Sequence, residues 1–189
     1  MAENAQLDVL RFVDVQVERK SAWGPGEFAS RQIEIDGRLL GEFLGTAAGH
    51  VIEQSTPLVD QHAGVITPAA YLRALLGGPK DDPLPEGRIA IGYCDGCLDA
   101  TCGVLLAANL SIEGSTVLWS SIGFDQFDAG PAPKLTPFWK KSAQQQPVAE
   151  VVQQWTPVPF EPAVTLRFDR DQYLEAIQNE RRRVGAGQL

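Results

Sequence analysis

The sequence predicts an α+β fold in which an antiparallel sheet carries a short central helix and a C-terminal helix. Three observations lead to this class. Several stretches show the period-two apolar alternation of half-buried strands. Two segments carry helix-capping residues, and a tight glycine-containing turn joins two neighbouring strands, as in an antiparallel hairpin. A chain of 189 residues is long enough to form one domain, 1–189, around one core.

In the first part of the chain, the pattern of apolar residues predicts two strands and a short helix. Alternation over residues 9–20 places on one face Val9, Val13, Val15 and Val17. After a Gly- and Pro-containing connection at residues 21–30, a second strand at 31–35 pairs antiparallel with the first, with Ile33 and Ile35 on one face. Asp36-Gly37 ends this strand. A short helical face then follows, made by Leu39, Leu40, Phe43 and Leu44.

The central helix and the middle strands are more clearly marked. Thr67 and Pro68 form an N-cap and first-turn pair, Gly77 fits the C-terminal capping position, and the apolar stripe between them consists of Tyr71, Leu72, Leu75 and Leu76. Three β-rich runs follow, at residues 88–94, 103–112 and 116–124, with a hairpin turn at 113–115.

The last part of the chain predicts a long irregular segment, a strand and a helix. Residues 125–162 hold seven of the 13 prolines and a run of glutamines, so we expect a long loop or insertion there. Asp125 and Asp128 are expected to be solvated loop acids, or a pair that binds a cation or a basic partner. Residues 163–168 predict a strand. Asp169 and Gln172 form the start of a helix, whose core-facing residues are Tyr173, Leu174 and Ile177, and residues 183–189 are expected to fray.

Composition and charge limit the partners and the compartment. The net charge of −8 argues against a nucleic-acid partner, and no apolar run is long enough to span a membrane. The first residues lack a basic, apolar signal pattern, and all three cysteines fall in one short segment. We therefore expect a cytoplasmic protein.

The cysteine segment YCDGCLDATCG is the candidate metal site. Cys94, Cys97 and Cys102 lie between two predicted strands, as the ligands of a zinc knuckle do. Zinc is the cofactor that this spacing favours, with His62 as the fourth ligand and His50, Asp95, Asp99 or a water as alternatives. Two other interpretations stay open: buried free cysteines in a tight turn, and thiol redox chemistry.

Trp23, Trp139 and Trp155 are candidate binding residues, because they lie in Gly- and Pro-rich segments. Tryptophans in such segments either pin the loop to the body of the protein or present an interaction surface.

Three stretches carry a resemblance: YCDGCLDATCG, VLWSSIGFD and LRFDRDQYLEAI. In these, the chain resembles a family of small bacterial proteins of actinobacterial type that share a Cys/Gly knuckle, a Trp-Ser strand and an F-D-R-x-Q-Y helix start. The residues that match are Cys94, Cys97, Cys102, Gly103, Trp119, Ser120, Phe168, Asp169, Arg170, Gln172 and Tyr173. The resemblance implies no activity, substrate or catalytic set.

The sequence favours a binding protein over an enzyme but leaves the choice open. It lacks the hydrolase, zincin and nucleotide-binding motifs GxSxG, HExxH, the Walker loop and GxGxxG. With the acidic net charge, this predicts a non-enzymatic binding module for a protein partner, of the immunity or antitoxin type. The alternative is a metal-dependent hydrolase or a thiol redox protein that uses Cys94, Cys97 and Cys102.

Overall fold

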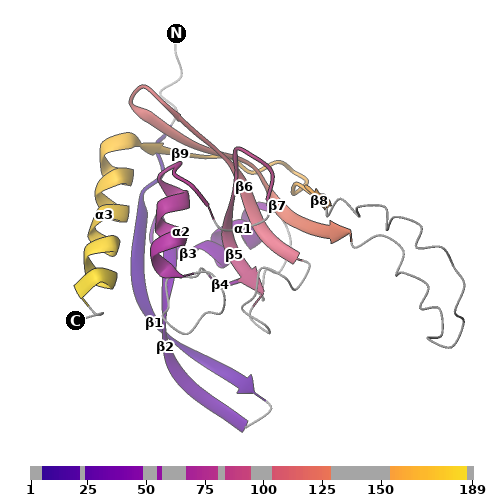
Figure 1. Cartoon of the computed structure of the whole chain (residues 1–189). Coiled ribbons are helices and arrows are strands. Elements are labelled where there is room, and N and C mark those ends of the chain that lie inside the picture. Colours follow the sequence, from indigo (N-terminus) through magenta and orange to yellow (C-terminus); the bar gives the residue numbers. More distant parts are fainter. Residues whose placement is uncertain are drawn as a thin grey trace, which may run out of the picture.

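The computed structural model describes residues 6–21, 24–48, 55–56, 67–80, 84–94, 104–128 and 154–186. It is α+β, with two antiparallel sheets and three helices in these ranges (Figure 1), as the sequence predicts. The strands are β1 (Leu10–Ser21), β2 (Gly24–Ile35), β3 (Arg38–Leu39), β4 (Ser55–Thr56), β5 (Arg88–Cys94), β6 (Val104–Glu113), β7 (Thr116–Asp128), β8 (Gln154–Thr156) and β9 (Leu166–Asp169). The helices are α1 (Leu40–Ala48), α2 (Pro68–Leu75) and α3 (Arg170–Ala186).

The smaller sheet has the order β1-β2-β3 and is dominated by a long β1–β2 hairpin. The hairpin extends well beyond the helices in Figure 1. Residues 24–30, expected to be a connection, belong to β2 and pair with β1. Asp36 and Gly37 make the turn to β3, with positive φ values of 50° and 77°.

The buried face of β1 differs from the predicted one. Leu10 is fully buried and Phe12 packs on the core, whereas Val9 is exposed. The alternation near the start of the strand is therefore shifted by one residue from the prediction, because a strand of apolar residues at both parities allows either face to turn inward. Ile33 and Ile35 are buried as predicted.

The larger sheet has the order β4-β5-β6-β7-β8, and β9 also pairs with β7. Gly114 and Ser115 form the turn of the β6–β7 hairpin, in which Glu113 pairs with Thr116. An irregularity in the pairing lies between Ala107 and Asn109 of β6, opposite Ser121, whose φ of 49° is left-handed. The two sheets meet where Asp8 bridges Phe168 of β9.

The capping predictions for both marked helices are confirmed. The Thr67 hydroxyl accepts a hydrogen bond from the Ala70 N–H (3.2 Å), and Gly77 follows α2 with a φ of 74°. The Asp169 carboxylate accepts a hydrogen bond from the Gln172 N–H (3.0 Å) at the start of α3. Helix α3 continues to Ala186, beyond the point where fraying was expected.

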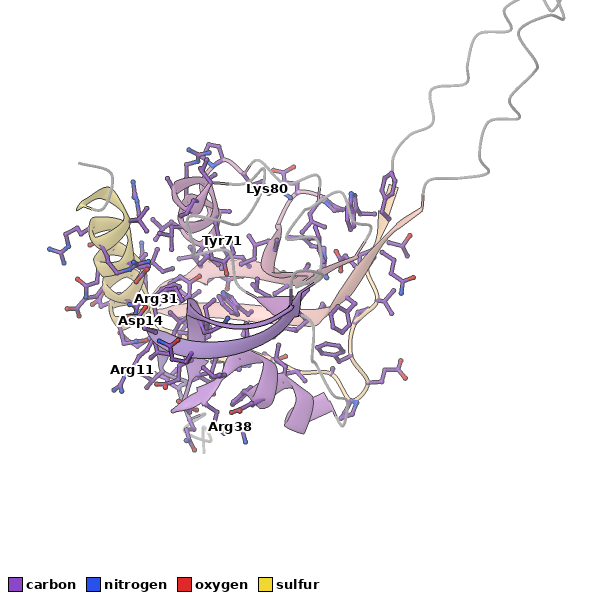
Figure 2. All side chains as sticks on the ribbon, turned by 90° about the horizontal axis from the view of Figure 1, so that it is seen from below. Arg11, Asp14, Arg31, Arg38, Tyr71 and Lys80 are labelled. Atoms are coloured by element: carbon purple, nitrogen blue, oxygen red, sulfur yellow. The ribbon has the colours of Figure 1, made fainter. Side chains whose placement is uncertain are left out.

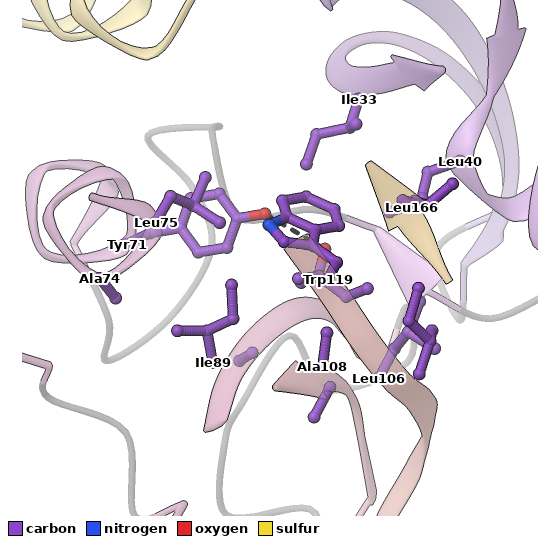
Figure 3. Close-up of a cluster of buried hydrophobic side chains, with 14 of the residues drawn as sticks. Ile33, Leu40, Tyr71, Ala74, Leu75, Ile89, Leu106, Ala108, Trp119 and Leu166 are labelled. Carbon is purple, nitrogen blue, oxygen red and sulfur yellow. Dashed lines mark hydrogen bonds between the residues drawn. The ribbon is translucent and has the colours of Figure 1, made fainter. Parts of the chain in front are cut away.

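The core centres on Trp119 of β7, which lies among side chains of both sheets and of α2 (Figure 3). Its ring meets Phe168 and Tyr173 edge-on, with centroids 5.3 and 6.1 Å away. The indole N–H donates to the Tyr173 hydroxyl (3.2 Å), which in turn donates to the Leu75 carbonyl (2.8 Å). Burial raises the pKa of this hydroxyl. The network fixes α3 and α2 to the larger sheet.

Parts of the expected loop at 125–162 are regular. Residues 125–128 belong to β7, and residues 154–156 form β8, which pairs with the end of β7. Asp125 is completely buried, so its expected role as a solvated loop acid is wrong. Its carboxylate pairs with the guanidinium of Arg88, whose Nε lies 2.6 Å from Asp125 Oδ2. Arg88 also donates to the Asn109 side chain (2.9 Å) and to the Ser121 carbonyl (3.2 Å), and so joins three strands.

Candidate functional site

A groove of about 350 Å³ lies between β1 and α3. Its first wall is the edge of β1 at residues 10–13, and its second wall is one face of α3. The α3 residues that line it recur at helical spacing: Gln172, Glu175, Ala176, Asn179, Glu180 and Arg183. From Gln172 to Arg183 the helix rises about 16 Å, which matches four to five residues of extended chain.

The groove exists because β9 ends where α3 begins. Beside β9, Asp8 holds the edge of β1 in place: its N–H donates to the Arg167 carbonyl (2.6 Å), and its carboxylate accepts from the Arg167 N–H (2.7 Å). Asp169 then caps α3, and the chain leaves the sheet as a helix. No described strand continues along this edge of β1 past Asp8.

Backbone groups of β1 point toward the side of the strand where no described strand pairs with it. The backbone N–H and C=O of Val9 point toward β2 and the β2–β3 turn. The Val9 carbonyl accepts a hydrogen bond from the Asp36 N–H (3.1 Å). Leu10 therefore points the opposite way, and its carbonyl accepts a hydrogen bond from α3. Along an antiparallel strand, the backbone N–H and C=O groups of successive residues point alternately toward the partner strand and away from it. Those of Phe12 and Asp14 therefore point away from β2, as those of Leu10 do.

At Leu10, the side chain of Gln172 occupies the hydrogen-bonding position at this edge of β1. Its side-chain Nε2 donates to the Leu10 carbonyl (2.7 Å), which is the bond that a neighbouring strand would make. Its Oε1 is buried and has no hydrogen-bond partner among the described residues. A buried acceptor without a donor is costly, so the Nε2 bond to Leu10 holds the Gln172 side chain here at the expense of its oxygen.

An ion-pair network beside the edge holds α3 to the hairpin. The Arg31 guanidinium on β2 donates to Glu180 Oε2 through Nε (3.1 Å) and Nη2 (2.9 Å), and its Nη1 lies 3.1 Å from Asp14 Oδ2. Glu180 is buried and also accepts from Arg183 Nε (2.6 Å). Figure 2 shows Arg31 and Asp14 together beside α3.

Two charged residues of the groove are free within the described part of the chain. Arg11 on β1 and Glu175 on α3 are exposed, and neither makes an ion pair or hydrogen bond to a described residue. The described lining residues carry three arginines and two glutamates, so the groove has a local charge of +1 in a chain of net charge −8. They include no hydroxyl, thiol or imidazole group.

The predicted metal ligands are only partly covered by the structure. Cys94 is the last residue of β5, where it pairs with Ser55 of β4. Cys97, Cys102 and His62 lie outside the described residues, so the knuckle stays a prediction. Residues 95–103 do join two neighbouring antiparallel strands, as predicted. Within the described residues, no three potential ligands gather into a metal site.

Of the three predicted binding tryptophans, the structure describes Trp155. Its ring is buried against Phe127, with centroids 5.5 Å apart. A ring in this position packs β8 against the end of β7. Of the two roles considered for these tryptophans, this packing corresponds to holding the loop against the body of the protein. Trp23 and Trp139 lie outside the described residues.

Sequence reasoning missed the groove. The signal was present in α3, where polar residues at helical spacing lie next to the core-facing stripe of Tyr173 and Ile177. Such a face ordinarily meets solvent. Only the position of α3 beside the edge of β1 shows that it forms a wall.

Comparisons with protein-family models, with curated proteins and with solved structures find no match to this chain. Among the described helices, none combines the length and apolar character that a membrane span requires.

Proposed function

We propose that this protein is a non-enzymatic binding module for a protein partner, and that the partner docks as an extended strand in the groove between β1 and α3. One observation carries the proposal: past Asp8, the edge of β1 beside α3 pairs with no described strand, and Gln172 makes to the Leu10 carbonyl the bond that such a strand would make.

Strand addition fits the chemistry of this edge. An extended segment in the groove would exchange two backbone hydrogen bonds with Phe12 and approach Asp14 next. Its affinity would come from main-chain groups, which β1 already holds in the required conformation through its pairing with β2. The absence of nucleophilic and imidazole groups among the described lining residues supports binding rather than catalysis.

The net charge supports a basic protein as the partner. A charge of −8 attracts a basic protein over distances of several ångströms and accelerates its association, while the groove itself supplies short-range contacts. This is the behaviour expected of an immunity or antitoxin-like protein, which acts by covering its partner. We expect this interaction to take place in the cytoplasm.

The test compares two substitutions at one residue. Phe12→Pro removes the edge N–H without removing a β1–β2 hydrogen bond, because that N–H points away from β2. Phe12→Ala removes the same ring but keeps the N–H. The tagged full-length chain and both variants are used to capture partners from a lysate of the source cells, with quantitative mass spectrometry as the readout.

We expect the wild-type chain to retain a protein, Phe12→Ala to retain the same protein more weakly because its ring contact is lost, and Phe12→Pro to lose it. Equal retention by all three chains, or no protein retained by the wild type, would contradict docking at this edge. Circular dichroism of both variants shows whether each is folded.

A further inference from the structure

The groove also specifies the side chains of its occupant, an inference that rests on the proposed function. We infer that the bound segment pairs with this edge through three consecutive residues: a β-branched apolar residue opposite Val13, an apolar residue opposite Phe12 and an acidic residue opposite Arg11.

The pleat of β1 determines which way each side chain of the segment points. Side chains directly opposite each other on neighbouring strands lie on the same face of the sheet, with Cβ atoms about 5 Å apart. Phe12 is on the core-facing side, where it is the register partner of buried Ile33. Arg11 and Val13 are on the other side.

The residue opposite Phe12 meets an apolar environment. Phe12 and Ala176 line the two walls of the groove, and both are partly buried against the hydrophobic core. A side chain placed between them would cover the remaining exposed part of the Phe12 ring. An apolar side chain gains about 25 cal/mol for each Å² that it buries there, whereas a charged one would lose hydration.

The residue opposite Arg11 meets an exposed guanidinium. Arg11 has no ion pair within the described part of the chain, and Glu34, its register partner on β2, makes no salt bridge with it. A carboxylate on the added strand would lie on the open side of Arg11, where opposite charges on neighbouring strands attract.

Glu175 carries the other free charge of the groove, but it projects from the helix wall. Arg11 lies on β1 itself, where directly opposite side chains of paired strands come within about 5 Å of each other. Arg11 therefore determines the charge preference of the segment, and Val13, a half-buried neighbour on the same face, favours a β-branched residue opposite it.

Gln172 determines where the ladder stops. The residue beyond the acidic one would lie opposite Leu10, whose carbonyl is already bonded to Gln172 Nε2. The ladder therefore ends at Gln172, and the acidic residue occupies the last full position before it.

The test is selection of peptides from a random 12-residue phage-display library on the immobilised full-length chain. Parallel selections use Phe12→Pro, Arg11→Glu and Arg181→Glu. Arg181 is exposed on α3 and does not line the groove, so its variant controls for a change of net charge. Affinities of selected peptides are then measured by fluorescence anisotropy.

We expect wild type and Arg181→Glu to enrich peptides that contain β-branched, apolar and acidic residues as a consecutive triplet, read in either direction of the chain, and Phe12→Pro to enrich none of them. Arg11→Glu should weaken such a peptide about fivefold to tenfold, and exchanging its acidic residue for lysine should restore most of the affinity.

Two further results overturn the inference in distinguishable ways. Peptides that require the free edge but show no acidic preference, or bind Arg11→Glu equally well, would refute the triplet and leave the binding function in place. Peptides that bind Phe12→Pro as well as wild type, or no enrichment at all, would refute both.

Discussion

Arg31 on β2 donates two hydrogen bonds to one carboxylate oxygen of Glu180 on α3, and this ion pair joins the β1–β2 hairpin to the C-terminal helix. Nε and Nη2 of Arg31 lie 3.1 and 2.9 Å from Glu180 Oε2, and Glu180 is 2% exposed. The pair spans 149 positions of sequence and fixes the distance between the two walls of the groove. The Glu180 carboxylate therefore contributes to the shape of the candidate site, together with the Gln172 bond to Leu10.

Glu180→Gln should lower the free energy of unfolding by about 2 kcal/mol, because Arg31 and Arg183 would lose their charged acceptor. Urea denaturation measures this loss. Glu175→Gln is the matched control, since Glu175 is exposed on the same helix and should change stability by less than about 0.5 kcal/mol. Equal effects of the two substitutions would mean that the network does not stabilise the fold.

The buried pair of Arg88 and Asp125 gives a second stability prediction. Asp125→Leu should cost about 3–5 kcal/mol, because it leaves a guanidinium that is 4% exposed without its counter-ion. The double variant Arg88→Met, Asp125→Leu should recover a large part of that loss, since no unpaired charge remains buried. Chemical denaturation of the three chains gives the coupling energy. Additive losses in the double variant would argue against a direct coupling.

The raised pKa of the Asp8 carboxyl predicts that the free energy of unfolding depends on pH. Burial raises the pKa of its carboxyl above the ordinary value, and the carboxylate of Asp36 raises it further, against a lowering by the Arg167 backbone N–H. The folded chain thus holds this proton more tightly than the unfolded chain. The free energy of unfolding should fall as the pH rises from about 4, the unfolded pKa, through the folded pKa.

Asp8→Asn removes this effect, so we expect a higher Tm than wild type at pH 7 and little difference at pH 3. Calorimetry across this range is the measurement. Glu86→Gln, in an exposed loop, should show no such dependence. A constant difference between Asp8→Asn and wild type at every pH would contradict the assignment.

The close approach of residues 158–160 to Gly123 of β7 leaves no space for a side chain at this position. A Cβ at this position would lie 2.0 Å from the Val158 carbonyl oxygen, so Gly123→Ala should lower stability by about 2 kcal/mol or more. Gly185, in α3, has open space around its Cα, and Gly185→Ala should leave stability unchanged or raise it by up to about 1 kcal/mol. Thermal unfolding of the two alanine variants tests the contrast.

The zinc prediction is tested by metal analysis of protein purified without chelators, together with a titration of thiols under native conditions. A knuckle formed by Cys94, Cys97 and Cys102 should hold one equivalent of zinc and protect its thiols. Cys102→Ser should lower the zinc content. Three freely titrating thiols and no metal would leave these cysteines without a metal-binding role.

Local signals in the sequence were sufficient for most secondary structure. Thr67, Gly77 and Asp169 act at helix ends through hydrogen bonds or φ angles within a few residues, so their roles can be deduced without the fold. The hairpin turn at Gly114 is equally local. The prediction of which face of β1 is buried was wrong, because Val9 and Leu10 are both apolar and only packing decides which of them is buried.

By itself, the sequence determined the α+β class, the antiparallel strands and the ends of α2 and the start of α3, because these follow from periodicity and from capping groups close in the chain. The tertiary structure alone decided that Asp125 is buried with Arg88, and that α3 lies beside the free edge of β1. Both depend on contacts between residues far apart in sequence, such as Gln172 with Leu10, separated by 162 positions. Burial and strand-edge pairing are properties of the packed chain, and no local pattern encodes them.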